Sequence, residues 1–266
     1  MESNSRCLHC TRPNPKAQLR LFCFHHAGGS STVFHAWRER LPDHVELWVV
    51  RLPGRGDRAG ESPLKRIAPV VQEVSEALVP FLKEPFALYG HSMGAAIAFE
   101  TARLVRRQHG AQPTRLLVSS CQAPQRLHFT LPTYNLPEAE FIEELRNLKT
   151  TPQPLFDDPR LLLMMLPVIR ADVELLQTYE YLADAPLDCP ITVFGGLQDQ
   201  VVKLAGLMGW RKQTTAQAIL HLLPGDHFFL NSYQQPFLEL LSAELKASIP
   251  RYNGVQAQRQ AAWVIH

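Results

Sequence analysis

The 266-residue sequence has no long hydrophobic run. Its longest uninterrupted apolar stretch covers residues 161–166 and lies between Arg160 and Pro167. This is far short of the roughly 20 residues that cross a membrane as a helix. The first 18 residues are polar and lack the apolar stretch of a signal peptide. We therefore expect a cytoplasmic protein without a membrane partner, in which residues 1–18 form a flexible tail.

A strong excess of charge of either sign is also missing. The chain carries 27 Lys and Arg residues against 25 Asp and Glu residues, which gives a formal net charge of +2. This balance provides no whole-chain field for binding nucleic acid, so we expect no nucleic-acid partner. A phosphate-binding loop of the form G-x-x-x-x-G-K-[ST] is absent from the sequence, and a nucleotide enzyme is therefore poorly supported.

Cysteine is scarce, and the five cysteines are an odd number for a disulfide framework. Cys23, Cys121 and Cys189 lie in or beside predicted strands, where a small thiol packs well. The stretch Cys7-Leu8-His9-Cys10 has the form of half a zinc site, but no second Cys or His pair follows at a suitable spacing. We expect reduced thiols, no metal and no other cofactor.

Short apolar runs alternate with helical patterns along most of the chain. Continuous apolar strands in βα order are typical of a parallel sheet covered by helices on both faces. The sequence therefore predicts an α/β core over residues 19–123 and 187–249, followed by a loose appendage over 250–266. The predicted strands cover residues 20–24, 46–52, 86–89, 115–121, 191–194 and 218–222, and the predicted helices cover 33–40, 67–82, 94–108 and 235–248.

Proline is abundant, with 21 residues against 14 glycines, and eight of the prolines fall between Cys121 and Cys189. This interval contains no convincing strand, because proline interrupts the ladder of a sheet. Two helical stripes remain, one from Phe141 to Leu148 and one from Leu162 to Leu176 through Pro167, which should kink the helix. We predict a helical lid over residues 124–186. The alternative is that these helices only cover the core.

The stretch Gly90-His91-Ser92-Met93-Gly94 follows one predicted strand and precedes a predicted helix. The pattern G-x-S-x-G alone is weak, but a strand, a tight turn and a helix in succession indicate a nucleophile elbow that exposes the Ser92 hydroxyl. Gly90 and Gly94 are needed because Cβ atoms there would collide as the chain reverses. The backbone N–H of Met93 would then point to where an oxyanion forms.

A serine nucleophile needs a base, and the expected chain order places a histidine last. Among the 11 histidines, His227 lies in a loop after the last predicted core strand and before the final predicted helix. His221 falls inside a strand, and we expect His26 and His91, which lie in loops of the site, to support its backbone geometry. His227 is therefore the predicted base.

The acid of the triad must come between Ser92 and His227. Asp199 follows the predicted strand 191–194, at the sheet edge that also carries Ser92. A carboxylate there would fix the tautomer of His227 and stabilise its protonated form. Asp226 is a rival, but its adjacency to His227 directs its side chain away from the ring. Asp184 and Asp188 precede the strand and so lie at its wrong end.

A glycine-rich turn, His25-His26-Ala27-Gly28-Gly29, follows the first predicted core strand. It is close to the loop that gives esterases their second oxyanion donor. The alternative is a glycine-rich turn without a ligand.

Six stretches of the chain resemble those of type II thioesterases, the free-standing α/β-hydrolases that accompany modular nonribosomal peptide and polyketide synthases. A serine elbow is common to all α/β-hydrolases, whereas RLPGR and P-x-I-R-A-D are more particular to this family. The stretches are FHHAGGS (24–30), RLPGRGDR (51–58), GHSMGA (90–95), PVIRAD (167–172), GGLQD (195–199) and GDHFFL (225–230).

The resemblance implies an α/β-hydrolase fold with Ser92, His227 and Asp199 as catalytic triad and the backbone N–H groups of Ala27 and Met93 as oxyanion hole. It also implies hydrolysis of acyl thioesters on the phosphopantetheine arm of acyl- or peptidyl-carrier domains, which clears stalled or wrongly primed carriers. The protein is expected to act as a monomer. One departure from the family is the residue at position 25, which is usually proline and is histidine here.

Two other functions stay open. A small-molecule carboxylesterase or lipase-like hydrolase would use the same triad. A non-catalytic carrier-binding protein would keep the fold, although an intact Ser, Asp and His in the expected order argue against it. Arg103, Arg106 and Arg107 either contact an acidic carrier or form a solvated helix face.

Overall fold

The computed structural model describes residues 5–129, 131–149, 151–249 and 263–265. Their strands form one sheet in the order β1-β3-β2-β4-β5-β6-β7-β8, in which only β1 is antiparallel to its neighbour. The strands are β1 (Leu8–Cys10), β2 (Leu19–Phe24), β3 (Val45–Val50), β4 (Phe86–His91), β5 (Arg115–Ser119), β6 (Ile191–Gly196), β7 (Ala218–Leu223) and β8 (Trp263–Ile265).

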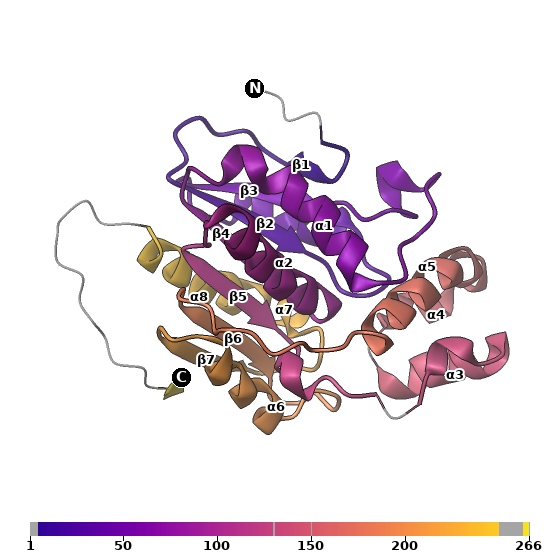
Figure 1. The fold of residues 1–266 in the computed structure, drawn as a ribbon. Coiled ribbons are helices and arrows are strands. Elements are labelled where there is room, and N and C mark those ends of the chain that lie inside the picture. The colour runs from indigo at the N-terminus through magenta and orange to yellow at the C-terminus, as the bar shows by residue number, and fades with distance from the viewer. Residues whose placement is uncertain (1–4, 130, 150, 250–262, 266) are drawn as a thin grey trace.

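Helices cover both faces of this sheet (Figure 1). Side chains alternate along β2, so that Phe22 packs into one apolar cluster with α1 and α2, and Leu21 packs into another with α8 and the 3₁₀ helix η1. These elements are α1 (Ile67–Leu78), α2 (Met93–His109), α8 (Gln234–Ala247) and η1 (Ser31–Glu39), and shorter helices are α6 (Leu204–Met208), α7 (Phe229–Ser232), η2 (Gly56–Arg58), η3 (Val79–Phe81), η4 (Pro124–Arg126), η5 (Thr133–Asn135) and η6 (Gly209–Gln213).

The segment between β5 and β6 forms a helical cap. It contains α3 (Glu138–Leu148), α4 (Gln153–Asp157) and α5 (Pro159–Gln177), which runs through Pro167. The cap helices share a small apolar cluster that includes Phe141 and Leu166. Figure 1 shows α3, α4 and α5 grouped beside the sheet, apart from the helices that cover its faces.

Two predictions about the ends of the chain are wrong where the structure describes them. Part of the predicted tail 1–18 forms β1, in which Leu8 pairs with Val50, and both Cys7 and Leu8 are buried. Part of the predicted appendage forms β8, which pairs with β7, while residues 250–262 and 266 lie outside the described residues. Three-residue edge strands carry too few side chains to show an alternating pattern, and this is why the sequence did not reveal them.

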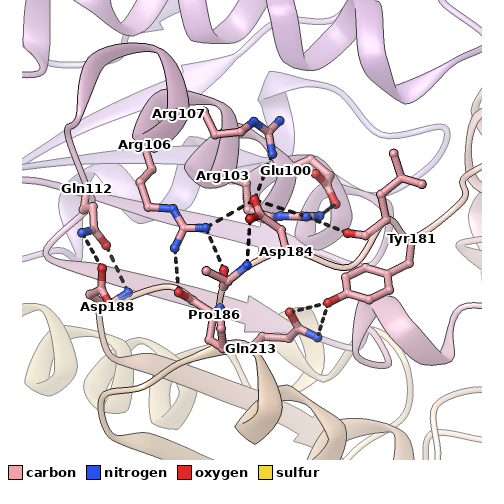
Figure 2. A network of polar contacts seen from close by, with 12 residues as sticks. Glu100, Arg103, Arg106, Arg107, Gln112, Tyr181, Asp184, Pro186, Asp188 and Gln213 are labelled. Atoms are coloured by element: carbon pink, nitrogen blue, oxygen red, sulfur yellow. Dashed lines mark hydrogen bonds and ion pairs between the residues drawn. The ribbon is translucent and has the colours of Figure 1, made fainter.

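The chain that returns from the cap to the core is held by the arginines of α2. Arg103 donates to the carbonyl of Leu182, and Arg106 donates to those of Ala185 and Pro186. Figure 2 shows Arg106 reaching Pro186 and Asp184 on this returning chain. Asp184 lies 3.5, 3.4 and 3.2 Å from nitrogen atoms of Arg103, Arg106 and Arg107.

These contacts bear on the three arginines, for which the sequence left open both a contact with an acidic carrier and a solvated helix face. The Arg103 side chain is only 4% exposed, and its guanidinium packs over the rings of Phe99 and Tyr181. Arg103 and Arg106 therefore bind Asp184 and backbone carbonyls of this same chain, whereas the Arg107 side chain is 49% exposed and contacts Asp184. Within the described residues, no helix is long and apolar enough to cross a membrane.

Candidate active site

The turn from β4 to α2 places Ser92 in a strained conformation. Its φ of 54° and ψ of −118° are rare for a residue with a side chain. A Cβ atom on Gly90 would overlap the backbone of Gly94, and one on Gly94 would overlap the backbone of Phe24. The two glycines are therefore required for the sharp reversal, as the elbow pattern predicts.

The three predicted triad side chains form one hydrogen-bonded chain. The distance from Ser92 Oγ to His227 Nε2 is 3.0 Å, and that from His227 Nδ1 to Asp199 Oδ2 is 2.9 Å. A ring with its proton on Nδ1 donates to the carboxylate and accepts from the serine hydroxyl. This arrangement can move a proton from the serine to the imidazole.

Asp199 is held as an anion. Its side chain is 1% exposed, and burial alone would raise its pKa. Hydrogen bonds from His227 and from the backbone N–H groups of Val201 and Val202 outweigh burial, so that the pKa of Asp199 is lowered. The rival Asp226 is exposed and accepts from the backbone N–H of Phe228.

Two further histidines pack beside His227. The His91 ring lies 5.5 Å from the His227 ring and 5.7 Å from the His26 ring, and its Nδ1 contacts Ser119 Oγ at 2.7 Å. Burial lowers the pKa of His91 well below its usual value and lowers that of His26 to about 3. Both rings are therefore neutral at pH 7 and act as packing partners.

Two backbone donors are available near the serine. Within the described residues, no hydrogen bond uses the N–H of Ala27 or that of Met93. Both residues line the same cavity as Ser92 and His227. Free N–H groups beside a nucleophile can stabilise an oxyanion.

The cavity above Ser92 has a volume of about 580 Å³ and is lined by residues of both the cap and the core. This size is within the usual range for a small-molecule site. The apolar cap residues that line it include Leu127, Leu131, Leu136, Leu148, Val173 and Leu176. Side chains of the cap therefore line the cavity that contains Ser92.

Sequence reasoning gave no role to Arg55 and Asp172, although both lie in stretches that resemble the thioesterase family. They form a buried ion pair of 2.6 Å beside the turn that carries Ala27. The available signal was their position in RLPGR and PVIRAD. The sequence did not show that these two stretches meet in space.

Comparison with known proteins identifies the family. The model of the thioesterase domain matches residues 19–245. The gramicidin S biosynthesis protein GrsT of Aneurinibacillus migulanus is 39% identical over 233 residues, which cover 88% of this chain and 91% of GrsT. The protein named linear gramicidin dehydrogenase LgrE, of Brevibacillus parabrevis, is 38% identical over 256 residues, which cover 95% and 97%.

A solved structure agrees with the sequence relatives. The type II thioesterase BorB from the borrelidin biosynthetic cluster superposes with a TM-score of 0.83 and 34% sequence identity, over 90% of this chain and 97% of BorB. The α/β-hydrolase fold and the resemblance to type II thioesterases are thereby confirmed. The chain belongs to the thioesterase domain family.

Proposed function

We propose that Ser92 is the nucleophile, His227 the general base and Asp199 the supporting acid of a thioester hydrolase. The observation that carries this proposal is the continuous hydrogen-bonded chain from Ser92 Oγ through the imidazole to Asp199. It begins on a strained elbow and opens into the apolar cavity. The family membership of the chain supports the same reaction.

Acylation begins when Ser92 Oγ attacks the thioester carbonyl carbon and its proton passes to His227 Nε2. The carbonyl oxygen becomes an oxyanion that accepts hydrogen bonds from the N–H groups of Ala27 and Met93. When the tetrahedral intermediate collapses, the carbon–sulfur bond breaks and His227 returns the proton to the departing thiolate. The products are an acyl ester of Ser92 and a free thiol.

Deacylation repeats the chemistry with water. His227 takes a proton from the water as its oxygen attacks the ester carbonyl, and the second oxyanion uses the same two N–H groups. Collapse breaks the bond to Ser92 Oγ, which recovers its proton from His227, and the carboxylic acid leaves. Because Asp199 is ionised, it stabilises the imidazolium in both halves of the reaction.

The substrate is an acyl group on the phosphopantetheine thiol of a carrier domain. The apolar cavity suits an acyl chain, and the names of related proteins connect them with gramicidin S biosynthesis and with a borrelidin cluster. The protein hydrolyses acyl thioesters in the editing of such assembly-line synthases. We further propose that it acts as a cytoplasmic monomer on docked carriers, without a nucleic-acid or membrane partner.

The test is deacylation of an acyl-loaded carrier protein by the full-length chain and by the Ser92→Ala variant. We expect the variant to lose about 10³-fold or more in kcat, because removal of a triad member leaves only binding and the oxyanion hole. Ser62→Ala, at an exposed position before α1, is the matched control and should keep full activity. Unchanged deacylation in Ser92→Ala would overturn the proposal.

Two further measurements separate the alternatives. A carboxylesterase would have a higher kcat/KM for simple esters than for the acyl-loaded carrier. A non-catalytic carrier-binding protein would bind the carrier, but a serine-directed phosphonate would not label it at Ser92.

A further inference from the structure

A carboxylate of the cap reaches the core directly beside the proposed oxyanion hole. Asp172 belongs to α5, and its Oδ2 accepts a hydrogen bond of 2.7 Å from the N–H of Gly28. The carboxylate also accepts two bonds from Arg55, of 2.6 and 2.7 Å, and Arg55 lies in the loop after β3. Three segments far apart in the sequence therefore meet at one carboxylate.

The ion pair is buried and its geometry is fixed. The side chains of Arg55 and Asp172 are 4% and 1% exposed, and their two parallel bonds form a bidentate pair. Arg55 Nη1 also donates to the carbonyl of Gly29 at 3.3 Å. Consequently, the pair holds one donor and one acceptor of the loop formed by residues 25–29.

The same loop orients the proposed oxyanion donor of Ala27. A trans peptide unit is planar, so the Ala27 N–H points opposite to the His26 carbonyl. That carbonyl accepts a bond of 3.0 Å from the N–H of Gly29 and contacts His25 Nδ1 at 2.8 Å. Because Asp172 and Arg55 fix Gly28 and Gly29, they also fix the peptide unit that carries the donor.

A second contact between α5 and this loop is the packing of Ile169 against Gly28. Gly28 has a φ of +72°, and a Cβ atom there would lie 2.8 Å from Cγ1 of Ile169. Ile169 is three residues before Asp172 and so lies on the same face of α5. The cap thus contacts the loop through one apolar and one charged side chain.

We propose that Asp172 is a positioning residue for thioester hydrolysis, through which the docked cap holds the Ala27 N–H in the orientation that stabilises the oxyanion. This inference rests on the proposed oxyanion role of Ala27. It makes the cap more than a wall of the acyl cavity, since α5 withdrawn from the core would leave the 25–29 loop without this anchor.

The first experiment measures kcat and KM of the full chain on an acyl-N-acetylcysteamine thioester. Asp172→Asn should lower kcat by about 10- to 100-fold, because a misplaced donor loses most of its stabilising effect, with KM changed by less than about threefold. The matched control is Glu174→Gln, on the same helix, which removes a cap–core ion pair with Arg66 and should keep wild-type kcat. Wild-type kcat in Asp172→Asn would overturn the proposal.

The second experiment separates positioning from general damage to the site. A trifluoromethyl ketone forms a tetrahedral adduct with Ser92 whose oxygen needs the oxyanion hole, whereas the matching thioether only fills the cavity. Asp172→Asn should weaken binding of the ketone by about 10-fold or more, and binding of the thioether by less than about twofold. Equal weakening of both ligands would show a merely structural role.

The third experiment covers the case in which Asp172→Asn fails to fold because the buried Arg55 has lost its carboxylate partner. In the double variant Arg55→Met with Asp172→Leu, apolar side chains replace the whole pair, which often preserves stability. We expect a folded protein with the same loss of kcat, and wild-type kcat here would reject the proposal. Ser92→Ala, measured alongside, shows separately whether the proposed function itself fails.

Discussion

At the scale of single residues, the burial of His25 makes the stability of the fold depend on pH. Its side chain is 1% exposed, and burial followed by the nearby charge of Arg55 lowers its pKa to about 3. An unfolded histidine has a pKa of about 6.5. Below that pH, His25 binds a proton in the unfolded chain but stays unprotonated in the folded chain. The free energy of unfolding must therefore fall as the pH drops toward 3.

His25→Gln should make this pH dependence shallower. Between pH 5.5 and 4.5 the free energy of unfolding of the wild type should fall more steeply than that of the variant, by about 1.4 kcal/mol per pH unit, which corresponds to one proton. Denaturant unfolding over a series of pH values measures both slopes. His109→Gln, at an exposed position, is the control. Parallel curves for wild type and His25→Gln would contradict the burial argument.

At the scale of elements, the elbow depends on how closely α2 approaches β2. A Cβ atom on Gly94 would lie 2.7 Å from the carbonyl oxygen of His25 and closer still to that of Phe24. Neither neighbour is the end of a flexible side chain, so the strand itself would have to move. The first turn of α2 and the end of β2 are therefore one unit, and it presents both Ser92 and the 25–29 loop.

We expect Gly94→Ala to destabilise the fold by about 3 kcal/mol or more, since overpacking against backbone cannot be relieved by a rotamer change. Thermal and denaturant unfolding measure the loss, and the folded fraction should also lose thioesterase activity. Gly60→Ala is the matched control, because within the described residues no heavy atom beyond Gly60 and its two chain neighbours lies within 4 Å of the added Cβ. A Gly94→Ala protein as stable as Gly60→Ala would show that α2 and β2 do not pack so closely at this point.

The same elements show what sequence could and could not predict. The six inner strands were predictable because continuous apolar runs alternate with helical patterns, and the elbow because its glycines have a steric purpose. The pairing of Arg55 with Asp172 was not predictable, because 117 residues separate them and neither type alone indicates a partner. Long-range polar pairing depends on how the cap docks, and local patterns carry no information on docking.

At the scale of the whole molecule, the cap is joined to the core at more than one place. Asp172 fixes α5 above the 25–29 loop, and the arginines of α2 fix the returning chain at Leu182 and Pro186. Between these attachments α5 lines the cavity with Val173 and Leu176. A cap held in this way sets the space left for an acyl chain.

Val173→Trp should therefore change which acyl chains are accepted. The larger ring would occupy cavity volume, so kcat/KM for a decanoyl thioester should fall by about tenfold relative to that for an acetyl thioester, which equals about 1.4 kcal/mol of discrimination. Leu163→Trp, 54% exposed on the same helix, should leave the ratio of the two rates unchanged. Both variants add the same ring to α5. A change in the ratio that both variants share would therefore indicate a general disturbance of this helix. A shift confined to Val173→Trp would assign chain-length selection to the cavity wall, and an unchanged ratio in both would place the acyl chain elsewhere.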